Sequence, residues 1–242
     1  DYVLGALQRT GKLPANAVAL KTIVTTEMAK AVAESYGAKC YDTFTGFKFI
    51  AEKKNALEST GEGKVLLSYE ESYGYMAGDY VRDKDAVTAS LLLTEMAAYY
   101  ADKGMTVLEA LQELYNKHGW YGEKTHNLVM PGLDGLADMA KLMKSLRETP
   151  PAEISGVKVV QFKDYADGSV TDLATGAKST MELSGSNVLR FEMADGTSVI
   201  VRPSGTEPKV KVYVLTKGAD AAGRDANLKK YADWVETLKK YI

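Results

Sequence analysis

The sequence predicts an α/β domain with a parallel or mixed sheet and crossover helices, followed by a smaller α+β domain with an antiparallel sheet and a C-terminal helix. In the first half, apolar strand-like runs alternate with helix-like patterns, which is typical of parallel strands joined by helices. In the second half, strand-like runs follow one another across short turns. The 242 residues are 45% hydrophobic and 26% charged, which supports two folded domains. The rhythm changes near residue 120, so we expect domains at residues 1–120 and 121–242.

The first domain is expected to begin with a helix over residues 2–8. Three strand-and-helix pairs follow, with strands at residues 17–24, 38–41 and 65–67 and helices at residues 26–36, 46–57 and 85–101. The last of these helices is apolar almost all round, which predicts that it lies buried at the centre of the domain. Thr106 and Glu109 fit a capping box, which predicts a further helix that ends near Gly119.

The second domain is expected to contain a helix at residues 133–146 and an antiparallel group of strands. Strands are predicted at residues 126–130, 157–162, 188–192, 198–202 and 210–215, with a turn at residues 194–196. The terminal helix carries an apolar stripe that should cover the sheet, formed by Leu228, Tyr231, Val235, Leu238 and Ile242. Residues 164–187 are predicted to form a loop or an irregular hairpin, without an assigned role.

Charge and composition exclude several classes of function. A net charge of -2 gives no general attraction to polyanions, so neither nucleic acid nor a membrane surface is an expected partner. The single Cys40 excludes an intramolecular disulfide and lies in a strand-like run, where a small buried thiol in a reducing, cytoplasmic setting is expected. The two histidines, His118 and His126, do not have the spacing of a metal-binding pair, so no metal ligand is expected.

Residues 201–213 carry the strongest functional signal. Their order, Val-Arg-Pro-Ser-Gly-Thr-Glu-Pro-Lys-Val-Lys-Val-Tyr, predicts a tight turn between two strands that contains Arg202, Ser204, Gly205 and Thr206. An arginine can donate two hydrogen bonds to phosphate, hydroxyls can donate one each, and glycine lets the backbone approach an anion. Alternation in the second strand allows Lys211 to join Arg202. An ordinary hairpin turn with a solvated lysine explains the same residues and stays open.

A second polar segment follows the strand predicted at residues 65–67. Open α/β sheets bind ligands just beyond the carboxyl ends of their strands. Glu70, Glu71 and Ser72 offer two carboxylates and a hydroxyl to vicinal sugar hydroxyls, and Arg82 and Lys84 offer positive charge to an anionic group. The segment is therefore suited to a phosphorylated sugar.

Three motifs in order resemble the phosphoglucomutase/phosphomannomutase family of phosphohexomutases. They are Thr-Gly-Phe-Lys at residues 45–48, Glu-Glu-Ser-Tyr-Gly with Asp-Lys-Asp-Ala between residues 70 and 86, and Arg-Pro-Ser-Gly-Thr-Glu-Pro at residues 202–208. The resemblance spans nearly the whole chain and corresponds to the third and fourth domains of a four-domain enzyme. Loops of the family's Thr-x-Ser-His-Asn-Pro and Asp-Gly-Asp-x-Asp-Arg types, which carry the phosphoserine and the metal, have no counterpart in this sequence. We therefore expect a C-terminal fragment without catalytic or metal-binding residues.

The resemblance implies roles for individual residues. Glu70 and Ser72 would contact sugar hydroxyls, and Lys84 would contact the substrate; a surface carboxylate at Glu70 and a helix-start lysine at Lys84 are the alternatives that stay open. Thr45 and Gly46 would belong to a loop against the sugar, with Thr45 also capping the next helix. Glu71 is a weaker candidate, and Lys48 is left open. The implied phosphate-binding residues are Arg202, Ser204, Gly205, Thr206 and Lys211, the last at a place where the family often has arginine.

The resemblance also implies a reaction. The intact enzyme would interconvert hexose 1-phosphate and hexose 6-phosphate through a phosphoserine, with Mg²⁺ and a sugar bisphosphate primer, neither of which this fragment would bind. Glucose phosphate is favoured, because Tyr73 and Gly74 stand where the bacterial phosphomannomutase branch has Gly-His, and mannose or pentose phosphate stay open. The missing N-terminal domains would be partners, and the fragment alone should not turn over. The alternative is a stand-alone phosphosugar-binding or regulatory module without chemistry.

Overall fold

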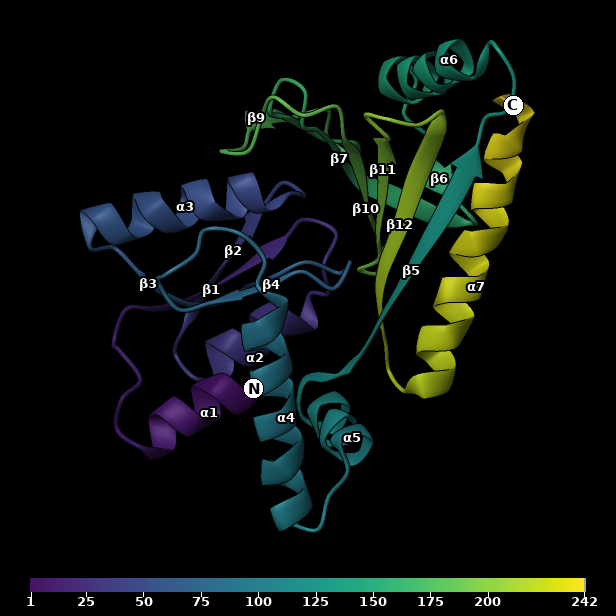
Figure 1. Cartoon of the computed structure of the whole chain (residues 1–242). Coiled ribbons are helices and arrows are strands. Elements are labelled where there is room, and N and C mark those ends of the chain that lie inside the picture. Colours follow the sequence, from purple (N-terminus) through teal and green to yellow (C-terminus); the bar gives the residue numbers. More distant parts are fainter. Residues whose placement is uncertain (242) are drawn as a thin grey trace. The chain divides into compact units, whose positions relative to one another are not determined.

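The structure, a computed structural model, describes residues 1–241. The chain divides into two compact units, the first ending at Gly119 and the second beginning at Trp120 (Figure 1). None of the helices among these described residues is long and apolar enough to span a bilayer.

The first unit contains a four-stranded mixed sheet in the order β2–β1–β3–β4. Strand β1 (Ala17–Thr22) pairs in parallel with β2 (Lys39–Thr43) and with β3 (Lys64–Tyr69). Strand β4 (Tyr75–Ala77) pairs antiparallel with β3. A helix lies in each connection between parallel strands, as the alternating sequence pattern predicts. The predicted fold class is confirmed, and β4 is an additional strand.

Helices lie on both faces of this sheet (Figure 1). Helix α3 (Phe47–Thr60) covers one face, where Leu20, Ile50 and Val65 are buried together. Helices α1 (Tyr2–Arg9) and α2 (Met28–Ser35) contribute to the core on the other face, with the buried residues Leu4, Ala17, Ala19, Ala33 and Ala38. Cys40 on β2 is only half-buried, rather than fully buried as predicted, and burial raises the pKa of its thiol to about 11.

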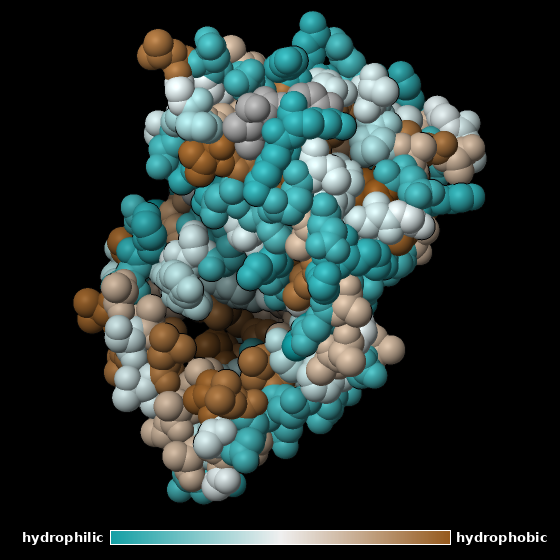
Figure 2. All heavy atoms as spheres, turned by 90° about the vertical axis from the view of Figure 1, so that its right-hand side faces the viewer, coloured by the Kyte–Doolittle hydropathy of each residue, from teal (hydrophilic) through white to brown (hydrophobic). Residues whose placement is uncertain are grey.

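Helix α4 (Ala86–Asp102) is not buried, contrary to the prediction. None of its residues is buried, and Val87 and Leu91 are 81% and 67% exposed. Asp85 caps the helix by accepting from two backbone N–H groups of the first turn. Figure 2 shows hydrophobic residues gathered around a hollow in the lower part of that view. The prediction was wrong because an apolar surface all round a helix is buried only when other elements pack on every side of it. The sheet of this unit packs on only part of that surface.

Helix α5 (Val107–His118) forms where local signals predict it. Thr106 Oγ1 accepts from the backbone N–H of Glu109, and the Glu109 carboxylate accepts from the backbone N–H of Thr106. Gly119 ends the helix with a φ of 108°, a conformation that suits glycine.

The second unit is built on an antiparallel sheet in the order β5–β12–β11–β10–β7–β8–β9, with β6 paired to β7. Its strands are β5 (Trp120–Val129), β6 (Glu153–Ile154), β7 (Val157–Asp164), β8 (Ser169–Asp172), β9 (Lys178–Thr180), β10 (Leu189–Met193), β11 (Ser198–Pro203) and β12 (Lys209–Gly218). Strands β8 and β9 form a hairpin inside the segment predicted as a loop or irregular hairpin.

Two long helices complete the core of this unit. Helix α6 (Gly135–Glu148) packs against β11 and β12, and helix α7 (Ala221–Thr237) lies along β5 and β12 (Figure 1). A short helical turn, η1 (Leu238–Tyr241), follows α7. The predicted stripe packs on the core through Leu228, Tyr231 and Val235 of α7 and Leu238 of η1, whereas Ile242 lies outside the described residues. The alternation predicted for β12 places Val210, Val212 and Val214 in the same core.

Candidate functional site

Three loops meet at the carboxyl edge of the parallel strands in the first unit. They follow β1 at residues 23–27, β2 at residues 44–46 and β3 at residues 70–74. Because parallel strands end at the same edge, residues far apart in sequence come together there. Hydrogen bonds join the third loop to both of the others, from Glu70 to Gly46 and from Glu71 to Thr22 and Thr25.

The turn between β3 and β4, Glu70–Gly74, is called the Glu70 turn below. The backbone N–H of Glu70 donates to the Gly74 carbonyl at 2.9 Å, which closes the turn. Glu70 Oε1 accepts from the backbone N–H of Gly46 at 2.6 Å. A Cβ at Gly74 would collide with the ring of Phe47 and lie 3.2 Å from Glu70 Oε2. The turn and the start of α3 are therefore in close contact, and the Glu70 carboxylate is held at that contact.

Gly46, and not Thr45, is the N-cap of α3. Gly46 has a φ of 115° and no side chain caps the helix. The cap predicted for Thr45 is therefore wrong, because the chain turns into the helix one residue later, in a conformation that glycine adopts readily. Thr45 remains half-buried beside Gly46.

Ser72 and Tyr73 form the exposed tip of the Glu70 turn. Tyr73 is 90% exposed and has a φ of 67°, in the left-handed region that non-glycine residues rarely occupy. Such strain concentrates at sites where the surrounding structure fixes the backbone. The sequence indicates the Ser72 hydroxyl but not the backbone of Tyr73, since nothing in a Ser-Tyr-Gly string indicates which residue takes the positive φ.

The basic residues after β4 separate into two groups. Lys84 Nζ lies 5.4 Å from the centre of the Phe47 ring and 3.0 Å from Asp83 Oδ1. The ring of Phe47 thus contacts both Lys84 and the Glu70 turn. Arg82 instead donates to Asn55 and forms an ion pair with Glu58, both on α3. Of the two positive charges predicted for the site, the structure brings only Lys84 to the Glu70 turn.

Lys48, which the sequence analysis left open, points elsewhere. Its Nζ lies 4.6 Å from the centre of the Phe49 ring, and its side chain is exposed.

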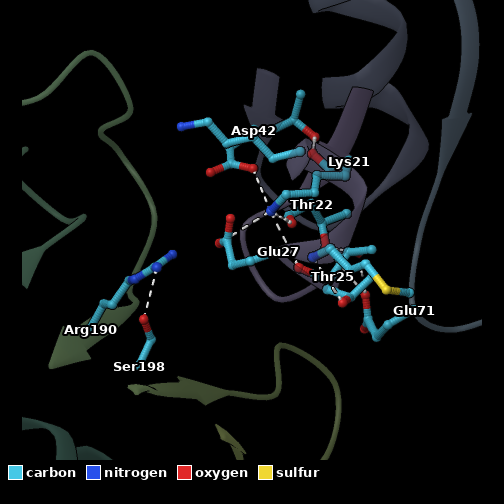
Figure 3. Close-up of polar contacts among 12 residues, drawn as sticks. Lys21, Thr22, Thr25, Glu27, Asp42, Glu71, Arg190 and Ser198 are labelled. Atoms are coloured by element: carbon cyan, nitrogen blue, oxygen red, sulfur yellow. Dashed lines mark hydrogen bonds and ion pairs between the residues drawn. The ribbon is translucent and has the colours of Figure 1, made fainter. Parts of the chain in front are cut away.

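Glu71 points away from the tip of the turn towards the loop after β1 (Figure 3). Glu71 Oε2 lies 3.2 Å from Thr22 Oγ1 and 3.4 Å from Thr25 Oγ1, and the two hydroxyls are 2.8 Å apart. Two hydroxyl protons cannot serve three contacts at once, so one threonine donates to the other while a remaining proton is donated to the carboxylate. Glu71 therefore holds the Glu70 turn in place.

Lys21, at the end of β1, lies beside these threonines (Figure 3), and the sequence motifs did not indicate it. It is 1% exposed and forms ion pairs with Asp42 at 2.7 Å and Glu27 at 3.3 Å. Its Nζ also donates to the Thr25 carbonyl at 3.2 Å. A lysine inside an otherwise apolar strand was the available signal, because a buried ammonium group requires such partners.

The second candidate region lies in the second unit, between β11 and β12. The segment Arg202–Lys209 is called the Arg202 loop below. Ser204 Oγ accepts from the backbone N–H groups of Thr206 at 3.3 Å and Glu207 at 3.2 Å, and the Ser204 N–H donates to the Lys209 carbonyl at 2.8 Å. Gly205 and Thr206 are exposed at the tip. The Ser204 hydroxyl thus orders the turn, a role the sequence analysis did not assign.

Arg202 and Lys211 are cross-strand neighbours on β11 and β12. Both side chains are half-buried, and within the part of the chain that the structure describes neither forms a hydrogen bond or an ion pair. Like charges that lie directly opposite each other in a sheet repel. Two unpaired cations at this position therefore favour an anion between them.

A hollow of about 360 Å³ opens beside the Arg202 loop within the second unit. Arg202, Ser204 and Gly205 line it together with residues of α6 and with Ser186 and Asn187. Asn187 also accepts from Arg147 at 2.7 Å, which fixes its position. Ser186 and Asn187 were missed because they end a segment without a local pattern, and only the sheet topology brings them to β11.

The described residues do not provide a metal site. Within residues 1–241, no group of three or more His, Cys, Asp or Glu side chains is arranged to hold an ion. The carboxylates of the Glu70 turn are instead occupied by Gly46, Thr22 and Thr25.

Comparison with protein families identifies both units. Residues 2–118 match phosphoglucomutase/phosphomannomutase, alpha/beta/alpha domain III. Residues 127–226 match the C-terminal domain of the same family.

Curated relatives include several bacterial phosphoglucomutases. That of Staphylococcus aureus strain N315 is 34% identical over 214 residues, which cover 88% of this chain and 38% of the relative. That of Staphylococcus saprophyticus is 34% identical over 194 residues, which cover 80% of this chain and 35% of the relative. The chain thus spans little more than a third of the length of these relatives.

Solved structures share the fold. The parafusin phosphoglucomutase of Paramecium, in its open form, aligns over 92% of this chain and 37% of its own, with a TM-score of 0.61 and 21% identity. A phosphoglucomutase/phosphomannomutase family protein of Burkholderia thailandensis aligns over 98% of this chain and 40% of its own, with a TM-score of 0.54 and 18% identity.

Proposed function

The chain belongs to the phosphoglucomutase/phosphomannomutase family, and we propose that it supplies the sugar-binding and distal-phosphate-binding part of a phosphohexomutase. The longer enzyme would interconvert hexose 1-phosphate and hexose 6-phosphate. The observation that carries this proposal is the pair Arg202 and Lys211. Their side chains lie opposite each other on the adjacent strands β11 and β12, and neither has an acidic partner among the described residues.

The Glu70 turn is proposed to hold the sugar ring. Glu70 is fixed by Gly46, and Ser72 stands exposed two residues further on, so a carboxylate and a hydroxyl are presented together. Lys84, across the Phe47 ring, would contact the same substrate. Thr45 and Gly46 would form the adjoining wall.

The Arg202 loop is proposed to hold the phosphate that does not react. Arg202 and Lys211 would supply charge, and the Ser204 and Thr206 hydroxyls and the exposed Gly205 backbone would supply hydrogen bonds. Binding energy from this remote group would orient the reacting end of the sugar, which raises the rate only if that orientation is realised in the transition state.

The chemical step is assigned to other parts of the longer enzyme. In this family a phosphoserine and Mg²⁺ carry phosphoryl transfer, with a sugar bisphosphate as primer. We assign binding and orientation to this chain, and not the transfer itself, because its sequence has no counterpart of the family's phosphoserine and metal loops. We infer a cytoplasmic enzyme and favour glucose phosphate, since the relatives above are named phosphoglucomutases.

A direct test compares Arg202→Ala with Arg224→Ala in the longer enzyme. Arg224 lies on α7, where it pairs with Asp225, so it is a matched arginine outside the site. Arg202→Ala should lower kcat/KM for glucose 1-phosphate roughly ten- to hundredfold, the loss of one charged hydrogen-bonding group. Equal effects of the two substitutions would contradict the phosphate role.

The same assay distinguishes the alternative, a binding module without chemistry. The chain of 242 residues should show no turnover with Mg²⁺ and glucose 1,6-bisphosphate, whereas the longer enzyme should be active. Absence of turnover in both would favour the module.

A further inference from the structure

Lys21 is a buried lysine on an inner strand of the first sheet, and the proposed function gives it no role. Strand β1 lies between β2 and β3, and Lys21 stands opposite Asp42 of β2 and Tyr69 of β3. Its side chain is 1% exposed. A buried ion pair is often no more stabilising than apolar residues of similar volume. Stability alone therefore does not explain a lysine at this position.

The ammonium group of Lys21 has three close acceptors, which match its three protons. Asp42 Oδ1 lies 2.7 Å from Nζ, the Thr25 carbonyl 3.2 Å and Glu27 Oε1 3.3 Å (Figure 3). The Thr22 carbonyl is more distant, at 3.4 Å. Asp42 belongs to β2, whereas Thr25 and Glu27 belong to the loop after β1. Lys21 thus fixes that loop against the end of β2.

The turn from Thr22 to Thr25 connects Lys21 to the Glu70 turn. The Thr25 N–H donates to the Thr22 carbonyl at 3.0 Å, and the two hydroxyls lie 2.8 Å apart. Both threonines are almost fully buried, with exposures of 0% and 3%. Their hydroxyls contact Glu71 Oε2. Because Lys21 holds the carbonyl of this turn and the hydroxyls of the turn hold Glu71, the position of the ammonium group determines where Glu71 is bound.

We propose that Lys21 is a positioning residue for the Glu70 turn, which acts through Thr25 and Glu71. Its directed hydrogen bonds fix the loop after β1, and an apolar side chain of the same length would leave that loop free to move. Glu71 in turn places the adjacent Glu70, whose carboxylate accepts from the Gly46 N–H at 2.6 Å. The consequence for sugar binding rests on the proposed function, whereas the link from Lys21 to Gly46 is a property of the fold.

The Gly46 amide proton reports this link without any ligand, because its signal lies further downfield the stronger its hydrogen bond to Glu70. In the nitrogen-15-labelled chain, Lys21→Met should move the Gly46 signal upfield. Thr25→Val keeps the branched shape of the side chain without its hydroxyl, so it leaves the buried charge in place and should move the signal in the same direction. An unchanged Gly46 signal in either variant would overturn the proposal.

Lys54 provides the matched control. Its side chain is also 1% exposed and also has three acceptors, Glu58 at 2.7 Å, Asp79 at 3.1 Å and the Val65 carbonyl at 3.3 Å. None of these acceptors belongs to the loop after β1 or to the Glu70 turn. Lys54→Met should lower Tm, as Lys21→Met does, but should leave the Gly46 signal in place. Equal shifts of that signal in the two variants would indicate a general loss of packing and overturn the proposal.

Kinetics of the longer enzyme measure the consequence for the substrate. Lys21→Met and Glu71→Ala should each lower kcat/KM for glucose 1-phosphate roughly tenfold. Because Lys21 acts through Glu71, the double variant should be little worse than either single variant, whereas independent effects would multiply. Multiplied losses in the double variant would overturn the proposal.

The proposed function and this inference fail in different ways. If Glu70→Ala leaves kcat/KM unchanged, the sugar-binding role of Glu70 is contradicted, and the Gly46 signal still decides whether Lys21 positions the turn. If Glu70→Ala lowers kcat/KM and Lys21→Met does not move the Gly46 signal, the role of Lys21 is contradicted and the sugar-binding role is retained.

Discussion

Glu70 and Glu71 are adjacent carboxylates with different tasks. Glu70 is held by the Gly46 backbone at the open edge of the sheet, and Glu71 is turned back to Thr22 and Thr25. Sequence alone names both as candidates, because the direction of a side chain in a turn depends on the backbone that follows. Only the bonding pattern separates the residue proposed to bind from the one that positions it.

The first prediction concerns Glu71. Glu71→Ala leaves a buried threonine hydroxyl without its acceptor, which should cost about 1–3 kcal/mol of unfolding free energy. Because the Glu70 turn loses its anchor, the Kd for glucose 1-phosphate should also rise. Glu71→Gln retains an acceptor oxygen and should recover part of both losses, as measured by urea unfolding and calorimetry. If the alanine and glutamine variants behave alike, the hydroxyl contacts do not position the turn.

The second prediction concerns Gly74. A methyl group at this position would collide with the Phe47 ring, so Gly74→Ala must displace the turn or the start of α3. Overpacking of this kind typically costs about 1–3 kcal/mol. Gly205→Ala is the matched control, because no atom lies within 4 Å of a Cβ built there. Similar thermal stability of the two variants would contradict the close contact.

At the scale of elements, local signals predicted most of the fold. The capping box of α5 and the alternation of β12 depend on residues only a few positions apart, and the structure has both. Strand β4 was missed because three residues carry too little pattern. The predicted burial of α4 was wrong. An apolar pattern indicates that a helix favours burial, but it does not show whether other residues are present to bury it.

The stability of the second unit is predicted to fall in acid through Glu192 on β10. Burial raises the pKa of Glu192, but the nearby charges of Arg190 and Lys163 outweigh it and hold that pKa below 4.5. A depressed carboxyl pKa stabilises the fold above the unfolded value and loses that contribution as pH falls through the folded value. Glu192→Gln should therefore lose stability at pH 7 and show a shallower decline between about pH 5 and pH 3.

Urea unfolding across that pH range checks this, with the exposed Glu153→Gln as control. If the unfolding free energy of Glu192→Gln declines with falling pH as steeply as that of the parent chain, other carboxyl groups determine the loss of stability in acid.

At the scale of the whole molecule, the sequence motifs indicated two functions on two separate units, and the compact units divide between Gly119 and Trp120. The Glu70 turn belongs to the first unit and the Arg202 loop to the second. Residues such as Ser186 and Asn187 became visible only through topology, because each contributes by lying beside a strand distant in sequence.

The central claim is that the Arg202 loop holds the phosphate of a hexose phosphate. Its most direct test is a titration of the nitrogen-15-labelled chain with glucose 6-phosphate, followed by amide signals. Signals of the Arg202 loop should shift along a saturable binding curve, those of β9 should stay fixed, and Arg202→Ala should weaken the shifts. No shift at the Arg202 loop, or shifts that Arg202→Ala leaves unchanged, would contradict the claim.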